Sequence, residues 1–423
     1  MKPVKATIIT IGDELLIGQV VDTNSAWIAQ QLNAQGISLL RRVSVGDEAK
    51  AITDALDEEL PLVDLLLITG GLGPTSDDIT KPVLCDYFGG KLRVDETVLA
   101  HVQEIFSRRN RPFLESNRKQ AEVPDNCQVI PNPLGTAPGM LFEKDGKLIV
   151  SMPGVPFEMK GMMNAVLLPL FNERLAKGRF IVHRNILTYG EGESFLAERI
   201  KDIEATLPGH IKLAYLPAPY SVRLRLTAEG TDEQQLITET ERFRDAMAER
   251  VEPFLVSFED LPLEHITGKL LAARGQSIGL AESCTGGYIA HLLTQINGSS
   301  AWFKGSVVSY ATSVKEEVLG LDPALIREEG VVSEAVAKAM AQAAIRVLKS
   351  DIGLGITGIL SEGAYEDTSP VGTLFIAVAD KKQVYAKKFH LRHDRVQNKD
   401  TAARLALFLA WQFISGKTPG SLI

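Results

Sequence analysis

The stretch TGGLGPTSDD, residues Thr69–Asp78, directly follows the apolar run Val63–Ile68. A short run of Val, Leu and Ile closed by glycines predicts a buried parallel strand that leads into a tight turn. Glycines lack Cβ, so backbone N–H groups can approach an anion closely, and a helix starting near Thr75 or Ser76 would point its positive end at the same place. The stretch therefore predicts a phosphate-binding turn.

Two carboxylates, Asp77 and Asp78, end this stretch. They would repel a phosphate unless a cation lay between them, which predicts an ion of the Mg²⁺ type that bridges carboxylate and phosphate. The alternative is that two acidic residues in a first helical turn simply complement the helix dipole. The sequence leaves both interpretations open.

Length and composition limit the possible classes of protein. A chain of 423 residues exceeds what one hydrophobic core usually organises, so two or three domains are expected. Hydrophobic residues at 45% and charged residues at 23% are typical of globular domains. A formal charge of −8 argues against a broad surface for nucleic acid or for an anionic membrane.

The three cysteines, Cys85, Cys127 and Cys284, lie far apart and have no metal-ligand spacing. This usage is typical of a reducing compartment and gives no zinc motif. No signal peptide is recognised, and no run reaches the roughly 18 apolar residues of a membrane span. We therefore expect a cytoplasmic protein.

Strand and helix patterns alternate in the first 170 residues. Strands are expected at Val4–Ile11 and Ile37–Val45, and helices after the cap cluster Asp22–Ser25 and at Glu48–Glu59. This alternation predicts an α/β fold with a mostly parallel sheet covered on both faces. Ligands bind at the carboxyl ends of such strands, which places residues 12–14 and the glycine turn on one rim.

Two later turns have the same character, Asn132–Gly139 and Met152–Met159. Either could be a plain surface connection. Ordinary loops need not be so poor in side chains, however, and we expect both turns on the rim that carries the first glycine turn.

The motifs TIGDELL (Thr10–Leu16), DTN (Asp22–Asn24), Thr69–Thr80, Gly135–Gly139 and PGVP (Pro153–Pro156) resemble the N-terminal domain of the CinA family, which is similar to the molybdopterin-binding fold. The resemblance implies a metal-dependent ADP-ribose pyrophosphatase that forms AMP and ribose 5-phosphate. It implies a divalent metal ion such as Mg²⁺, with a monovalent cation such as K⁺ as a further candidate. The implied metal ligands are Glu14, Asp77 and Asp78. The implied substrate-binding residues are Gly12, Asp13, Asn24, Gly70, Gly71, Gly73, Thr75, Gly135, Thr136, Gly139 and Gly154.

A small α+β unit is expected between Arg184 and Glu249, where CinA proteins have a KH-like module. A KH module that binds nucleic acid needs a Gly-x-x-Gly loop. The nearest candidate, Gly190–Glu193, has the wrong spacing and two carboxylates. The sequence favours a connector or dimer-forming role over RNA binding.

The motif ESCTGG (Glu282–Gly287) follows a predicted strand at Ser277–Ala281. A serine at such a turn, beside glycines and the amides of a helix start, has the elements of a nucleophile next to an oxyanion hole. The histidines lack a supporting motif, so the base is not evident. Lys315 is one candidate if burial lowers its pKa, and the alternative is an ordinary solvated lysine.

The same turn, together with Tyr310–Lys315, GVVSE (Gly330–Glu334), Thr357-Gly358 and PVGT (Pro370–Thr373), resembles the CinA C-terminal domain, a family of Ser/Lys nicotinamide-mononucleotide deamidases. Carried over, Ser283 attacks the carboxamide, Lys315 is the base, and amides near Thr285 and Gly286 hold the oxyanion. Cys284 is a rival nucleophile by position. The resemblance implies the catalytic residues Ser283, Lys315, Thr285 and Tyr310, and the substrate-binding residues Gly286, Gly287, Thr357, Gly358, Arg395 and Lys399.

Two departures from that family count against full activity. Leu360–Asp367 replaces a glycine-rich Ala-Gly-Pro loop with bulk and three carboxylates, and Lys399 stands where the family has its second arginine. Lysine keeps the charge but not the bidentate fork for phosphate. A weakened or altered deamidase is therefore expected.

The sequence as a whole predicts three domains: residues 1–172 molybdopterin-binding-like, 173–256 KH-like, and 260–418 deamidase-like. The leading hypothesis is a homodimeric two-activity hydrolase of pyridine-nucleotide salvage that acts on ADP-ribose and nicotinamide mononucleotide, without nucleic-acid or membrane partners. One alternative keeps only the pyrophosphatase, with a degenerate rear domain. Another is a non-catalytic scaffold that binds nucleotide or molybdopterin.

Overall fold

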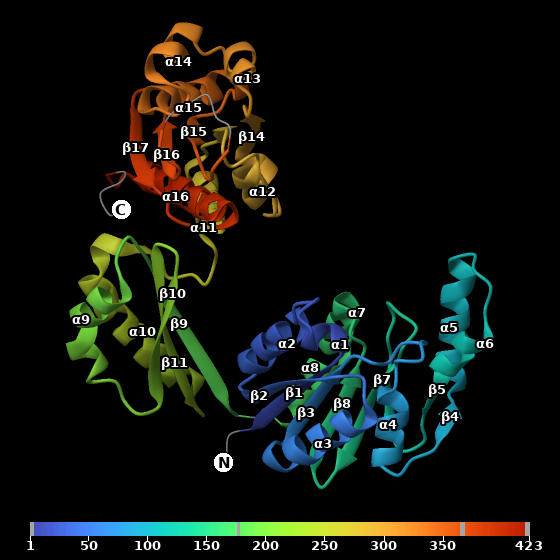
Figure 1. Cartoon of the computed structure of the whole chain (residues 1–423). Coiled ribbons are helices and arrows are strands. Elements are labelled where there is room, and N and C mark those ends of the chain that lie inside the picture. Colours follow the sequence, from blue (N-terminus) through green and yellow to red (C-terminus); the bar gives the residue numbers. More distant parts are fainter. Residues whose placement is uncertain (1–3, 176–177, 364–368, 419–423) are drawn as a thin grey trace. The chain divides into compact units, whose positions relative to one another are not determined.

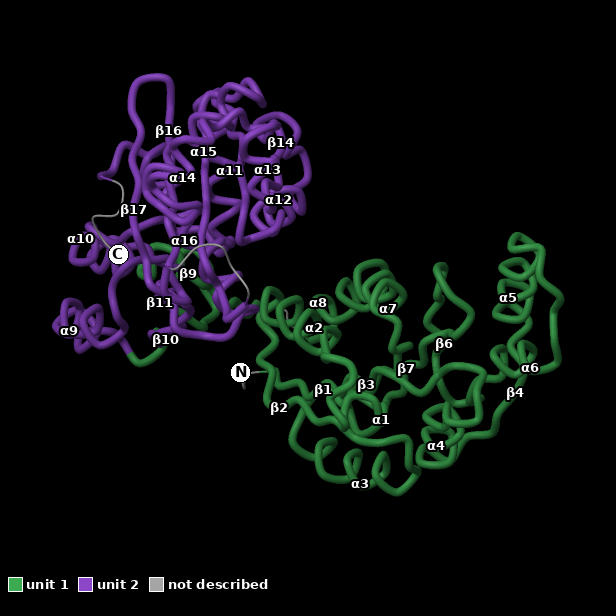
Figure 2. Tube along the Cα trace, turned by 45° about the horizontal axis from the view of Figure 1, so that its top comes forward, with its two compact units in different colours: residues 1–183, 209–211, 227–240 green, residues 184–208, 212–226, 241–423 purple. Residues whose placement is uncertain are grey.

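The computed structural model describes residues 4–175, 178–363 and 369–418. The chain forms two compact units, shown in Figure 2. The first comprises residues 1–183, 209–211 and 227–240, and the second comprises 184–208, 212–226 and 241–423. Elements of the middle module are thus divided between the two units. No helix in the described ranges is long and apolar enough to cross a membrane.

The first unit contains a six-stranded sheet with the order β2-β1-β3-β8-β7-β6 (Figure 1). The first four strands in this order are mutually parallel, and β7 runs antiparallel to both of its neighbours, β8 and β6. The prediction of a mostly parallel α/β sheet is confirmed. The strands are β1 (Lys5–Ile11), β2 (Ser38–Val45), β3 (Leu65–Thr69), β6 (Gln128–Ile130), β7 (Gly139–Lys144) and β8 (Lys147–Met152).

Helices cover both faces of this sheet, because neighbouring residues of its strands point to opposite sides. Ile8 of β1 packs in one buried cluster with Ile28 and Leu32, and Ile9 packs in another with Ile52 and Leu56. The helices of this unit are α1 (Asp13–Leu16), α2 (Thr23–Ala34), α3 (Ala49–Glu59), α4 (Thr80–Tyr87), α5 (Glu96–Arg108), α6 (Glu115–Arg118), α7 (Pro156–Met162) and α8 (Leu168–Arg174). A separate two-stranded ribbon consists of β4 (Leu92–Val94) and β5 (Glu122–Pro124).

The helix after the glycine turn begins at Thr80, not near Thr75 or Ser76 as expected. The intervening loop is closed by the carboxylate of Asp78, which accepts hydrogen bonds from the Gly73 amide at 2.7 Å and the Thr75 amide at 2.9 Å. The expectation of a helix start at the turn itself was therefore wrong. The alternative that both aspartates complement a first helical turn fails for the same reason.

The middle module forms a four-stranded sheet with the order β10-β11-β9-β12. Its elements are β9 (Phe180–Tyr189), α9 (Glu193–Glu204), β10 (Ile211–Ala218), β11 (Ser221–Gly230), α10 (Glu233–Arg250) and β12 (Leu255–Ser257).

The rear domain contains a five-stranded sheet with the order β14-β13-β15-β16-β17, in which β13, β14 and β15 are parallel and β16 runs antiparallel to both of its neighbours, β15 and β17. Its strands are β13 (Ile278–Glu282), β14 (Phe303–Val308), β15 (Ile352–Gly358), β16 (Thr373–Ala379) and β17 (Val384–His390). Its helices are α11 (Leu263–Arg274), α12 (Tyr288–Thr294), α13 (Thr312–Glu317), α14 (Pro323–Glu329), α15 (Glu334–Leu348) and α16 (Arg395–Ser415).

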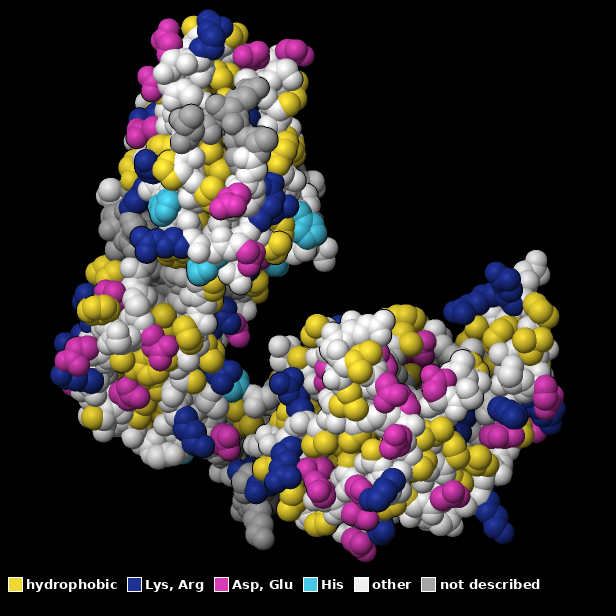
Figure 3. All heavy atoms as spheres, in the orientation of Figure 1, with side chains coloured by type: hydrophobic (Ala, Val, Ile, Leu, Met, Phe, Trp, Pro, Cys, Tyr) yellow, Lys and Arg dark blue, Asp and Glu magenta, His cyan; other side chains and the backbone are white. Residues whose placement is uncertain are grey.

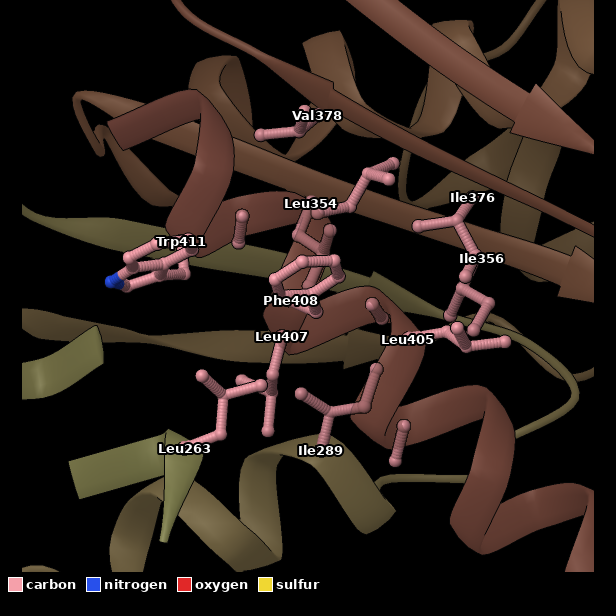
Figure 4. Packing of buried hydrophobic residues seen from close by; sticks show 14 of the residues in the cluster. Leu263, Ile289, Leu354, Ile356, Ile376, Val378, Leu405, Leu407, Phe408 and Trp411 are labelled. Atoms are coloured by element: carbon pink, nitrogen blue, oxygen red, sulfur yellow. The ribbon is translucent and has the colours of Figure 1, made fainter. Parts of the chain in front are cut away.

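The long helix α16 anchors this domain. Its residues Leu405 and Phe408 pack in one buried cluster with Leu354, Ile356 and Ile376 of the sheet, as Figure 4 shows. Burying aliphatic and aromatic side chains of this size contributes roughly 1.5–3 kcal/mol each. The carboxyl end of β13, which leads into the candidate nucleophile Ser283, therefore belongs to a well-packed sheet.

Candidate active sites

The ESCTGG motif forms a tight turn at the carboxyl end of β13. The Ser283 amide donates to the carbonyl of Ile356 at 3.1 Å, and the Gly286 amide donates to the carbonyl of Ser283 at 3.0 Å. Gly286 and Gly287 have φ angles of +59° and +88°, a left-handed geometry that favours glycine. The Gly286 amide is thus occupied within the turn, and its expected role as an oxyanion donor is not met in this conformation.

Lys315 on α13 reaches the Ser283 side chain. Its Nζ donates to Ser283 Oγ at 3.1 Å and to the carbonyl of Ser309 at 2.5 Å. The lysine side chain is fully buried, and this burial lowers its pKa to about 8. The alternative of an ordinary solvated lysine was therefore wrong. A buried amine with such a pKa is partly neutral near physiological pH and can accept a proton.

A cavity of about 490 Å³ opens beside this pair. Arg395 brings a guanidinium group to its wall and donates to Ser361 Oγ at 2.9 Å and to the Tyr310 hydroxyl at 2.8 Å. The cavity is lined by Ser283, Cys284, Tyr310, Ala311, Thr312, Ser313, Val331, Val332, Thr357, Gly358, Ile359, Leu360 and Arg395. The site thus combines a hydroxyl, a buried amine and a fixed positive charge.

Other predicted residues of this site lie elsewhere. Gly286 and Gly287 are absent from the described cavity lining, and Thr285 is fully buried with its hydroxyl donating to Glu282 at 2.8 Å. Lys399 places its Nζ 5.4 Å from the centre of the Tyr288 ring and does not line the cavity.

Leu360, the first residue of the altered loop after β15, lines the cavity. It is 2% exposed and also packs in the core of the domain, while its carbonyl accepts a hydrogen bond from Asn398 Nδ2 at 2.9 Å. The expectation that this loop weakens nucleotide binding stays a prediction. Residues 364–367 of the predicted loop lie outside the described residues.

The rival nucleophile Cys284 is a buried member of the hydrophobic core of this domain. Burial raises the pKa of its thiol to about 12. Because the thiolate is the reactive form of cysteine, this thiol is a poor nucleophile near neutral pH.

A second cavity, of about 290 Å³, lies at the carboxyl ends of β1 and β3. Gly70 has φ +111°, and a Cβ there would lie 2.1 Å from the carbonyl oxygen of Ile11, so only glycine fits. The predicted residues that line this cavity are Gly12, Glu14, Asn24, Gly70, Gly71, Asp77, Asp78 and Gly154. Strand topology therefore brings together the DELL, DTN, glycine-turn and PGVP motifs.

Carboxylates gather at this cavity. The Asp13 amide donates to Asp47 Oδ2 at 3.0 Å, and the Asp47 amide donates to Asp13 Oδ1 at 3.3 Å. Burial, followed by the charges of Asp13, Glu14 and Asp77, raises the pKa of Asp47. Asp47 was not among the residues predicted from the sequence, although its position two residues after the parallel strand β2 was a usable signal.

The carboxylate and amide oxygens here are the donor type that hard cations such as Mg²⁺ prefer. Asn24 Oδ1 is buried without a hydrogen-bond partner in the described part of the chain, while its Nδ2 donates to the Gly154 carbonyl at 2.6 Å. However, no group of three His, Cys, Asp or Glu side chains among the described residues forms a ready metal site. Asp78 also uses both carboxylate oxygens to close its own loop.

Not every predicted residue joins this cavity. Gly135 and Thr136 line a separate cavity of about 510 Å³. Gly139 is the first residue of β7, and a Cβ at this position would clash with the end of the Met162 side chain. This loop nevertheless lies on the rim of the first glycine turn, as predicted, because β7 is antiparallel to β8 and begins beside the carboxyl end of β8, next to that of β3. It lines a different cavity on that rim. Gly73 and Thr75 do not line the cavity either and instead bind the Asp78 carboxylate.

Comparison with known proteins agrees with this architecture. Residues 7–173 match the family described as a probable molybdopterin binding domain, residues 183–256 match the damage-inducible protein CinA KH domain, and residues 260–414 match the CinA C-terminal domain. The predicted ranges were 1–172, 173–256 and 260–418.

Relatives share the whole arrangement. A CinA-like protein of Flavobacterium psychrophilum is 44% identical over 97% of this chain and 98% of its own length, and one of Salinibacter ruber is 41% identical over 95% and 98%. The crystal structure of a CinA protein from Thermoplasma acidophilum is 36% identical and covers 39% of this chain and 97% of its own, with a TM-score of 0.37. The chain belongs to the CinA family, which confirms the resemblance inferred from its motifs.

Proposed function

We propose that the rear domain is a Ser/Lys amidohydrolase that releases ammonia from nicotinamide mononucleotide. The observation that carries this proposal is the 3.1 Å contact between the buried Lys315 amine and Ser283 Oγ beside a cavity of nucleotide size. Ser–Lys pairs are an accepted variant of the nucleophile–base arrangement.

The contacts of the Lys315 amine support its role as the base. A neutral amine has two N–H hydrogens and one lone pair. With one hydrogen donated to the Ser309 carbonyl at 2.5 Å, the lone pair can accept the Ser283 hydroxyl proton over the 3.1 Å contact. Burial lowers the pKa of Lys315 to about 8, so a useful fraction of the amine is neutral at physiological pH.

The reaction then proceeds in two balanced halves. Ser283 Oγ bonds to the carboxamide carbon while Lys315 takes its proton, and the C–N bond breaks as that proton passes to the departing ammonia. In the second half, Lys315 takes a proton from a water molecule, whose oxygen bonds to the acyl carbon. The ester bond to Ser283 Oγ then breaks, the proton returns to Ser283, and the carboxylic acid of the nucleotide is released. The Cys284 and Thr285 amides are the remaining donors of the turn for the oxyanion, and the Arg395 guanidinium on the cavity wall suits the substrate phosphate.

Replacing the nucleophile tests this proposal. Ser283→Ala should abolish ammonia release, whereas Cys284→Ala, which removes the rival nucleophile next to it, should retain release. Both variants should cleave ADP-ribose like the wild type. Ammonia release that persists in folded Ser283→Ala would refute the serine mechanism.

For the front domain we propose a cation-assisted hydrolysis of the ADP-ribose diphosphate to AMP and ribose 5-phosphate. Gly70 and Gly71 offer backbone without side chains to a phosphate, and the carboxylates of Glu14, Asp47 and Asp77 lie on or beside the same cavity. A divalent cation bound there would neutralise the diphosphate charge; the chain's own role is to hold the phosphates and the cation ligands in place.

A pair of aspartate variants tests this second activity. Asp77→Asn at the cavity should lose ADP-ribose cleavage, while the exposed Asp54→Asn on α3, which is paired only with Lys50 in the described structure, should keep it. Equal ligand binding with and without divalent ions, and no turnover in either case, would favour the scaffold alternative.

A further inference from the structure

Glu282 is a fully buried carboxylate directly before the nucleophile, and it takes no part in the proton transfers of the proposed reaction. We propose that Glu282 is the positioning residue that fixes Ser283 against Lys315. This inference rests on the proposed amidohydrolase function for its catalytic readout, but its structural argument depends only on the contacts of Glu282.

The Glu282 carboxylate accepts two hydrogen bonds on each oxygen. Oε2 accepts from the Thr285 hydroxyl at 2.8 Å and from the Ile289 amide at 3.1 Å. Oε1 accepts from the Ala290 amide at 3.0 Å and from the Ser306 hydroxyl at 3.0 Å. The side chain therefore connects the nucleophile turn, the start of α12 and strand β14.

The main chain of Glu282 connects to the base. Its carbonyl accepts the Ser309 amide at 2.7 Å, and the Ser309 carbonyl in turn accepts the Lys315 amine at 2.5 Å. The side chain of Glu282 thus holds the turn that carries Ser283. The backbone of Glu282 holds the segment at Ser309 that orients Lys315. A displacement of Glu282 would change the distance between the two reacting groups.

The hydrogen-bond pattern makes this position specific for a carboxylate. Glutamine has the same length but carries an NH₂ group in place of one oxygen. In either orientation of that amide, the NH₂ group would face a backbone N–H, of Ile289 or of Ala290, which can only donate. Glu282→Gln must therefore break at least one of these bonds and move the turn, because a buried donor cannot be left facing a donor.

The test compares two buried glutamates of the same domain, Glu282→Gln and Glu264→Gln on α11, in the full-length protein. We expect Glu282→Gln to lower kcat for ammonia release by about 100-fold, the scale of a displacement near 1 Å, with KM for nicotinamide mononucleotide unchanged. The pH midpoint of activity should also stay in place, since Lys315 remains buried. Glu264→Gln should leave kcat unchanged even if it lowers the melting temperature.

A second readout does not depend on the substrate. The rate at which an alkyl fluorophosphonate labels Ser283, followed by mass spectrometry with Ser283→Ala as the blank, reports the reactivity of the hydroxyl itself. This rate should fall with kcat in Glu282→Gln. If wild-type protein is labelled but releases no ammonia, the proposed substrate is wrong, and the labelling rates still test the role of Glu282.

Three results would overturn the inference: labelling and kcat unchanged in folded Glu282→Gln, a loss that follows the folded fraction in a thermal melt, or a shifted pH midpoint. If Glu282→Gln does not fold, Ser306→Ala decides the question, because it removes one hydroxyl donor and leaves the Ala290 amide on the same oxygen. A drop of about tenfold, the equivalent of 1.4 kcal/mol, is expected there, and no drop would refute the positioning role.

Discussion

The pH dependence of ammonia release follows from the burial of Lys315. Burial lowers the pKa of its amine from 10.5 to about 8, so the folded protein loses this proton in the range where an exposed lysine keeps it. Only the neutral amine can take the proton of Ser283. We therefore expect kcat/KM to rise with pH and to level off once the pH passes about 8.

The size of the rise distinguishes a buried from an ordinary lysine. With a pKa of about 8, the neutral fraction is about 9% at pH 7 and about 91% at pH 9, a tenfold rise that is nearly complete. An amine with the ordinary pKa would give about a hundredfold rise over the same range without a plateau.

The assay measures ammonia released from nicotinamide mononucleotide well below its KM between pH 6.5 and 9.5. Cleavage of ADP-ribose by the same samples serves as a control for denaturation. Lys315→Arg should be inactive throughout, because a guanidinium group is not deprotonated in this range. A hundredfold rise without a plateau, or a profile with no dependence on pH, would refute the assignment of Lys315 as the base.

Three further predictions concern the two cavities. Asp78→Ala should abolish ADP-ribose cleavage and lower thermal stability by several degrees, because the amides of Gly73 and Thr75 lose their acceptor; unchanged cleavage would show that the loop needs no such anchor. Ser361→Ala should raise KM for nicotinamide mononucleotide severalfold with kcat unchanged, since Arg395 loses its hydrogen bond to Ser361 Oγ; a change confined to kcat would contradict a binding role. Treatment with EDTA should stop ADP-ribose cleavage and spare ammonia release, and loss of both activities would mean that the rear site also needs a cation.

Acidic and basic side chains are interspersed over the face of the molecule shown in Figure 3. The absence of a nucleic-acid partner stays a prediction, which rests on the formal net charge of −8.

Local sequence patterns were sufficient for many of the elements and turns, although not for the start of α4. The apolar pattern of Val4–Ile11 predicted a strand one residue longer than β1, and the glycines of Thr69–Asp78 predicted the turn after β3. Such features depend on residues close together in the chain, where φ angles and hydrophobic periodicity act. The pairing of Ser283 with Lys315 needed the family resemblance, since 32 residues separate them.

Only the tertiary structure decided which loops share a cavity and which groups are buried. Asp47 joins the front site because β2 lies beside β1, whereas the loop of Gly135 and Thr136 lines another cavity of the same rim because β8 separates β7 from β3. The lowered pKa of Lys315 likewise arises from segments distant in sequence that exclude water from its amine. The sequence by itself determined the local elements and the chemistry of each turn, whereas strand order and desolvation, which are properties of the packed chain, decided where that chemistry comes together.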